Sequence, residues 1–212
     1  MSDFAAYLPG FLAAYAILIV AASSPGPAVA MLLGIATTQG RGAAMTATLG
    51  IASGSVLLNL GTLLGVGLLL SQAAWAMSVL RLIGAAYLLW LAYGAFRKAV
   101  NPPVLRPGGA DAPRSALALF LLGFGLQVTN PKAIVFWLAI ASIGATAGGG
   151  MGVIGAFVLG AFVISFACHG AWAILLSSKP IRAAYGAGRR WIEAALGGFF
   201  AFAAFKLATS ET

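Results

Sequence analysis

Charged side chains are scarce in this chain. Of its 212 residues, only 8% are charged and 61% are hydrophobic, and the mean hydropathy is +1.00. A soluble domain has about 25% charged and about 45–50% apolar residues. Four Asp and Glu together with 12 Lys and Arg cannot cover a surface exposed to water. The sequence therefore predicts an integral membrane protein, and its length predicts one domain, 1–212.

Cysteine, histidine and acidic residues are also nearly missing. The chain has one cysteine, Cys168, and one histidine, His169. A single Cys excludes a disulfide framework, a CxxC redox pair and a Cys-rich zinc site. A membrane enzyme needs a nucleophile–base pair or a metal cluster, and these residues form neither. We therefore expect no enzymatic activity, no metal and no cofactor.

Long stretches without charge predict membrane-spanning helices. A span needs about 20 residues at a rise of about 1.5 Å per residue. The longest stretches are divided by Ser71-Gln72 and by a glycine-rich run at 144–150. The sequence predicts an all-α integral membrane protein with six transmembrane helices, at 4–36, 43–70, 74–96, 115–143, 151–176 and 190–208.

The basic residues lie almost entirely on one side of the predicted membrane. Lys206 is the one basic residue assigned to the opposite side. By the positive-inside rule, both termini lie outside the cytoplasm. The same rule accounts for the net charge of +8, so we expect no nucleic-acid partner. The loops after the first, third and fifth helices contain Arg41, Arg97, Lys98, Arg106, Arg114, Lys179, Arg182, Arg189 and Arg190.

The longest predicted connection is a cytoplasmic linker at 97–114, which divides the chain into halves at about 1–96 and 115–208. Each half has three helices. Because three is odd, the second half must be inverted relative to the first. The similarity of 81–96 to 190–205 agrees with two inverted three-helix repeats.

Proline interrupts the first helix of each half. One break reads Ser24-Pro25-Gly26-Pro27 and the other Gln127-Val128-Thr129-Asn130-Pro131-Lys132. Proline removes a backbone donor and clashes with the preceding turn. Within a membrane, such a break is tolerated where it is packed in protein or lines a cavity. Broken helices at corresponding positions of two inverted halves indicate the substrate site of a transporter; the alternative is two simple proline kinks.

Lys132 follows the second break directly. A lysine near the bilayer centre costs roughly 2.5–3.5 kcal/mol on insertion scales, so we expect it to face a wet cavity. Its ammonium would bind a substrate carboxylate there, as would the N–H groups at the start of a half-helix. The alternative is a structural cation bonded to the carbonyls of a broken helix.

Three motifs follow one another along nearly the whole chain: Ser24-Pro25-Gly26-Pro27, Gly84-Ala85-Ala86-Tyr87-Leu88 and Asn130-Pro131-Lys132-Ala133. In this order and spacing, they resemble the LysE/RhtB family of bacterial inner-membrane amino-acid exporters. The resemblance implies a six-helix, multi-pass exporter of amino acids or close derivatives, driven by the proton-motive force without ATP. In agreement, the chain has no phosphate-binding GxxxxGK[ST] loop.

Departures from the family pattern favour a neutral substrate. Exporters of lysine or arginine tend to have Asp where this chain has Ser55, and His where it has Lys132. A cationic substrate side chain needs a carboxylate to offset its desolvation. Glu193, the one acid inside a predicted span, is expected to pair with Arg190. We therefore expect a substrate like homoserine, threonine or leucine; the alternatives are a basic amino-acid exporter or a non-transporting membrane assembly subunit.

Three further polar residues are candidates. We predict that Ser55 and Asn59 bind substrate, although Asn59 lies between two GxxxG motifs and would equally serve as an interhelical hydrogen bond. His169 is a candidate proton carrier; its alternative is a packing role. The glycine motifs also allow a homodimer. The predicted substrate-binding set is Ser24, Pro25, Gly26, Pro27, Ser55, Asn59, Gln127, Asn130, Pro131 and Lys132.

Overall fold

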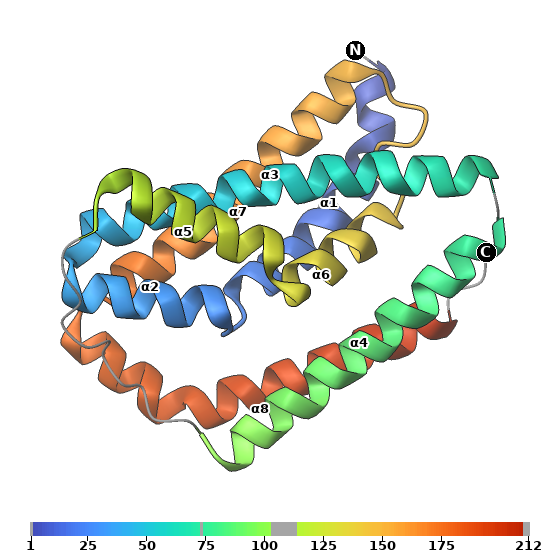
Figure 1. The fold of residues 1–212 in the computed structure, drawn as a ribbon. Coiled ribbons are helices and arrows are strands. Elements are labelled where there is room, and N and C mark those ends of the chain that lie inside the picture. The colour runs from blue at the N-terminus through green and yellow to red at the C-terminus, as the bar shows by residue number, and fades with distance from the viewer. Residues whose placement is uncertain (1, 73, 103–113, 210–212) are drawn as a thin grey trace. The chain divides into compact units, whose positions relative to one another are not determined.

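The computed structural model describes residues 2–72, 74–102 and 114–209, and within these ranges every regular element is a helix (Figure 1). Most of the linker predicted at 97–114 lies outside them. The helices are α1 (Ser2–Ser23), α2 (Pro27–Thr38), α3 (Gly40–Gln72), α4 (Ala74–Val100), α5 (Ala116–Thr129), α6 (Pro131–Ala141), α7 (Met151–Leu175) and α8 (Lys179–Thr209).

Several helices are long and apolar enough to cross a membrane. Among the described residues these are Phe4–Ser23, Gly40–Gly65 and Met151–Leu175. The pair α5 and α6, bent by 61° at its break, adds a fourth when counted as one span. The all-helical membrane class is therefore confirmed, whereas the six spans and the inverted repeat stay predictions.

Both predicted breaks are confirmed. The helix predicted at 4–36 is α1 and α2, and the one predicted at 115–143 is α5 and α6. The helix predicted at 190–208 begins earlier, at Lys179. Its Pro180 lies in the first turn, where backbone N–H groups have no acceptor within the helix. Proline therefore costs no helical hydrogen bond there and is favoured.

The helices form two compact units, each of which takes helices from both predicted halves of the chain. The first unit, Met1–Val66 with Pro107–Ser177, holds α1, α2, α5, α6, α7 and most of α3. The second, Gly67–Arg106 with Ser178–Thr212, holds α4 and α8, which pack along each other (Figure 1).

Glu193 is buried on α8 in the second unit, at 2% exposure. Its ion-pair partner is Arg189, with 3.7 Å between Nε and Oε1, so the predicted pair with Arg190 is wrong. Residues four apart lie on the same helix face, and Arg189 is the basic residue that shares the buried face with Glu193.

A close crossing of α3 and α5 organises the first unit. A Cβ at Gly50 would overlap the carbonyl of Phe120, and one at Gly123 would overlap the carbonyl of Ala47. Only glycine lets two helix backbones approach this closely. The crossing brings Gly54 against the side chain of Gln127. In contrast, a Cβ at Gly61 or Gly65 meets nothing within 4 Å in the described chain.

Two hydrophobic clusters fill the first unit. One lies between α2, α3, α5 and α7 and is built mainly from small side chains with Leu32, Ile35, Ile51 and Leu119. The other lies between α1, α6 and α7 and contains larger side chains: Phe11, Leu18, Trp137, Ile140 and Phe157.

Candidate functional site: a cavity between two helix breaks

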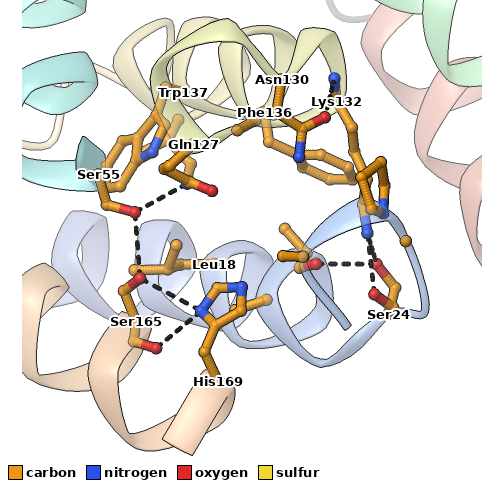
Figure 2. A pocket seen from close by; sticks show the side chains of 17 residues that line it. Leu18, Ser24, Ser55, Gln127, Asn130, Lys132, Phe136, Trp137, Ser165 and His169 are labelled. Carbon is orange, nitrogen blue, oxygen red and sulfur yellow. Dashed lines mark hydrogen bonds between the residues drawn. The ribbon is translucent and has the colours of Figure 1, made fainter. Parts of the chain in front are cut away.

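A cavity lies in the first unit where the two broken helices meet (Figure 2). It holds about 470 Å³ of space, including the part at its mouth that is open to the surroundings. Pro25, Asn59 and Pro131 of the predicted set are outside its lining. Its walls bring together the predicted Ser24, Gly26, Pro27, Ser55, Gln127, Asn130, Lys132 and His169 with Leu18, Ala21, Ala22, Ala28, Ala133, Phe136, Trp137, Ile140 and Ser165.

The first break lies between α1 and α2 and has no cap of its own. Gly26, with extended backbone (φ −169°, ψ −166°), precedes Pro27 and has no side chain with which to cap α2. Side chains of other helices bind the carbonyls at the end of α1. The Trp172 indole donates to the carbonyl oxygen of Ser23 at 3.2 Å, and Lys132 Nζ donates to that of Ser24 at 3.0 Å.

The second break lies between α5 and α6 and caps itself. Asn130 ends one helix and begins the next. Its N–H donates to the carbonyl oxygen of Gln127 at 3.3 Å, and its side-chain oxygen accepts from the N–H of Lys132 at 3.1 Å. Asn is a preferred N-cap, and Pro131 follows at the first helical position, where proline fits. Pro131 therefore shapes the backbone of the break from outside the cavity.

Lys132 joins the two breaks. Its half-buried side chain extends from the start of α6 to the end of α1, where Nζ donates to the carbonyl oxygen of Ser24 and contacts its hydroxyl oxygen (Figure 2). This contact is the one foreseen for a structural cation at a broken helix. Lys132 also lines the cavity, so the same ammonium lies within reach of a small molecule there; its role in substrate binding stays a prediction.

The beginnings of α2 and α6 both lie on the cavity wall. Gly26, Pro27 and Ala28 line it from one break, and Asn130, Lys132 and Ala133 from the other. The first turn of a helix carries about half a positive charge and N–H groups without helical acceptors. No Asp or Glu is among the described residues that line the cavity. This part of the wall is therefore suited to an anionic group.

A hydrogen-bonded cluster of polar side chains forms another wall. The Gln127 amide donates to the Ser55 hydroxyl at 2.8 Å, and the hydroxyls of Ser55 and Ser165 lie 3.1 Å apart. His169 Nδ1 is 2.8 Å from the carbonyl oxygen of Ser165 and 3.5 Å from its hydroxyl. Ser165 was not among the residues predicted from the sequence. Its one available signal was the four-residue spacing from His169, which places both side chains on one face of α7.

Asn59 lies one turn beyond Ser55 on the same face of α3. It is buried, and its amide nitrogen has no hydrogen-bond partner in the described part of the chain. Neither of its two predicted roles, substrate binding or an interhelical hydrogen bond, is decided by this position.

The sequence matches the model of the LysE type translocator family over residues 19–211. The chain belongs to this family. It is 29% identical over 197 residues to the threonine efflux protein of Escherichia coli (strain K12), covering 90% of this chain and 93% of that protein. It is 32% identical over 134 residues to the leucine efflux protein of Klebsiella pneumoniae, covering 63% and 60%. No solved structure matches the chain.

A further relative is the chemotactic transduction protein ChpE of Pseudomonas aeruginosa, 33% identical over 128 residues, which cover 53% of this chain and 62% of that protein. The family match confirms the resemblance found in the sequence. It identifies the chain as a membrane-spanning transporter, and together with the apolar helices it indicates a multi-pass protein of the inner membrane.

Proposed function

We propose that this protein exports a small neutral amino acid across the inner membrane, coupled to the proton-motive force. One observation carries the proposal. In a chain of the LysE type translocator family, the beginnings of two half-helices and a lysine ammonium line the same cavity. Relatives named for the efflux of threonine and of leucine support an amino-acid substrate.

The part of the cavity wall formed by Lys132 and by the beginnings of α2 and α6 would bind the carboxylate of the substrate. Lys132 and the first N–H groups of α2 and α6 supply the positive charge and the donors that a carboxylate needs. The ammonium of the substrate would meet acceptors across the cavity, among them the oxygens of Ser24, Gln127 and Asn130. Half-helix N-termini are directed at anionic substrate groups in this way in other secondary transporters.

A neutral substrate fits the absence of acid from the described lining. The ammonium of a lysine side chain would lose its hydration inside the cavity and would find no carboxylate to replace it. Glu193, the buried acid of the second unit, is already paired with Arg189. The alternatives are export of a basic amino acid and a non-transporting role in a membrane assembly.

Transport would proceed by alternating access, with two inverted three-helix repeats rocking around a midplane site. The two breaks at corresponding positions of the predicted halves support this arrangement. In this proposal, Pro25 and Pro131 hold the breaks open from outside the cavity, and Asn59 contacts substrate in another conformation. Both termini lie on the outer side of the membrane.

Counterflow into proteoliposomes tests the proposal. Vesicles are loaded with unlabelled threonine, homoserine, leucine or lysine, and entry of the labelled amino acid is followed. We expect saturable exchange of a neutral amino acid by the purified protein alone. Faster exchange of lysine would support an amino-acid exporter but would contradict the proposal that its substrate is neutral. No exchange of any of the four by folded protein would favour the assembly subunit.

A further inference from the structure

The ring orientation of His169 leaves one nitrogen for the cavity. Nδ1 lies 2.8 Å from the carbonyl oxygen of Ser165. A carbonyl can only accept a hydrogen bond, so Nδ1 carries the hydrogen. In the neutral imidazole, Nε2 then holds an unshared electron pair and acts as an acceptor. Nε2 has no hydrogen bond in the described chain and lies on the cavity side of the ring (Figure 2).

The charged surroundings of His169 are simple. Helices α1, α2 and α3 contact α7, and none of them adds a titratable side chain to the described cavity wall. Tyr15 of α1 contacts α7 at the carbonyl of Phe157, three turns from His169. Lys132 of α6 is the one other titratable group in that wall, and α3 and α5 contribute the uncharged Ser55 and Gln127.

An amino-acid zwitterion needs hydrogen-bond donors for its carboxylate and an acceptor for its ammonium. Lys132 and the beginnings of α2 and α6 supply the donors. Of the acceptors around the cavity, Nε2 of His169 is the most basic, because the others are hydroxyl, amide and carbonyl oxygens. Once protonated, Nε2 donates instead of accepting, and the imidazolium repels an ammonium.

We propose that Nε2 of His169 is occupied in turn by the ammonium of the substrate and by a proton, so that each excludes the other. This inference rests on the proposed function. When the amino acid leaves on the outer side, a proton from that side binds the electron pair of Nε2. The protonated site then faces the cytoplasm, releases the proton and binds the next amino acid.

The exchange has a defined charge balance. The ammonium keeps its three protons throughout, and the proton transferred is one taken from water outside and released to water inside. Because the zwitterion has no net charge, each cycle moves one amino acid outward and one positive charge inward. Competition at a single nitrogen thus couples the two movements without a membrane carboxylate.

Proton release by the wild-type protein is the direct test. Threonine or leucine is added to the purified protein in weak buffer containing a pH-indicator dye. We expect binding to release up to one proton per site at a pH where His169 is partly protonated. Below that range, the apparent Kd should rise by about tenfold for each pH unit, as for competition with one proton.

His169→Gln tests the nitrogen itself, since an amide oxygen still accepts a hydrogen bond but is far less basic than an imidazole nitrogen. We expect this variant to lose both proton release and acceleration by a pH gradient, and we expect its Kd to become independent of pH. Cys168→Ala is the matched control, because Cys168 is the neighbouring residue on α7 and lies outside the cavity lining. It should behave as wild type in both measurements.

The outcomes separate the two proposals. Binding and exchange by the wild type with no proton release and a Kd independent of pH would overturn the inference and leave the exporter in place. Proton release that persists in His169→Gln would overturn it as well. Failure to bind or exchange any amino acid would overturn the proposed function instead. If His169→Gln does not fold, proton release and the pH dependence of Kd in the wild type decide.

Discussion

The two helix breaks of the first unit interrupt their helices by different means. The break between α5 and α6 is built from its own sequence, because Asn130 caps α6 through the N–H of Lys132. The break between α1 and α2 depends on other helices, since Trp172 and Lys132 bind the carbonyls of Ser23 and Ser24. One break is fixed locally, and the other is held by tertiary contacts.

This difference has a consequence for transport. The ammonium that holds the first break is the same group that we propose binds the carboxylate of the substrate. A carboxylate at Lys132 would compete with the Ser24 carbonyl for its protons. We therefore expect substrate binding to loosen the first break and to leave the second unchanged, so the first break is the one that changes shape.

The largest effect is expected for Lys132→Met, which removes the link between the breaks. The Ser24 carbonyl loses a charged donor, and the substrate loses its cation. Hydrogen bonds to charged groups contribute roughly 1.5–3 kcal/mol, so we expect transport to fall by about 10- to 100-fold or more. Counterflow rates and a thermal unfolding curve measure the two losses. Lys132→Arg, which keeps the charge, should retain more of both; equal rates in wild type and Lys132→Met would contradict a role for Lys132 in binding the substrate.

The next largest effect is expected at the helix crossing that positions the second break. Gly123→Ala would place a methyl group on the Ala47 carbonyl, so α3 and α5 must separate and Gln127 must move away from Ser55. We expect a lower melting temperature and slower counterflow. Gly34→Ala in α2 is the matched control, since nothing described lies within 4 Å of its Cβ. Equal melting temperatures for the two variants would contradict the close crossing.

A moderate effect is expected for Asn130→Ala. It removes the acceptor for the N–H of Lys132 and leaves the first turn of α6 uncapped. Loss of an N-cap costs about 1 kcal/mol, within a range of about 0.5–2 kcal/mol. Thermal unfolding should show this loss, and Asn130→Asp should restore most of it because a carboxylate also caps. An unchanged melting temperature for Asn130→Ala would mean that the second break does not depend on its cap.

The smallest effect is expected for Gly26→Ala, the corresponding change at the first break. Gly26 supplies no side-chain cap, its extended backbone suits other residues, and an added Cβ would lie 3.4 Å from Lys132 Nζ, at the near limit of ordinary contact. We expect counterflow and melting temperature close to wild type. A loss as large as that of Asn130→Ala would show that the first break, too, is fixed by its local sequence.

Local chemistry made both breaks predictable from sequence, because proline acts on its own helix. Lys132 was predictable as a cavity residue because a charge in a membrane helix is costly. Ser165 was not, since a serine in an apolar helix carries no signal until its partners on other helices are known. The pairing of Glu193 with Arg189 was missed because two basic residues lie at helical spacing from it, and burial decides between them.

In the proposed mechanism, Lys132 and the two half-helix beginnings bind the carboxylate of the substrate. Inhibition of labelled threonine counterflow by threonine and by threoninol, in which a CH₂OH group replaces the carboxylate, tests it directly in the wild type. We expect strong inhibition by threonine and little by threoninol at the same concentration. Equal inhibition by both compounds would contradict it.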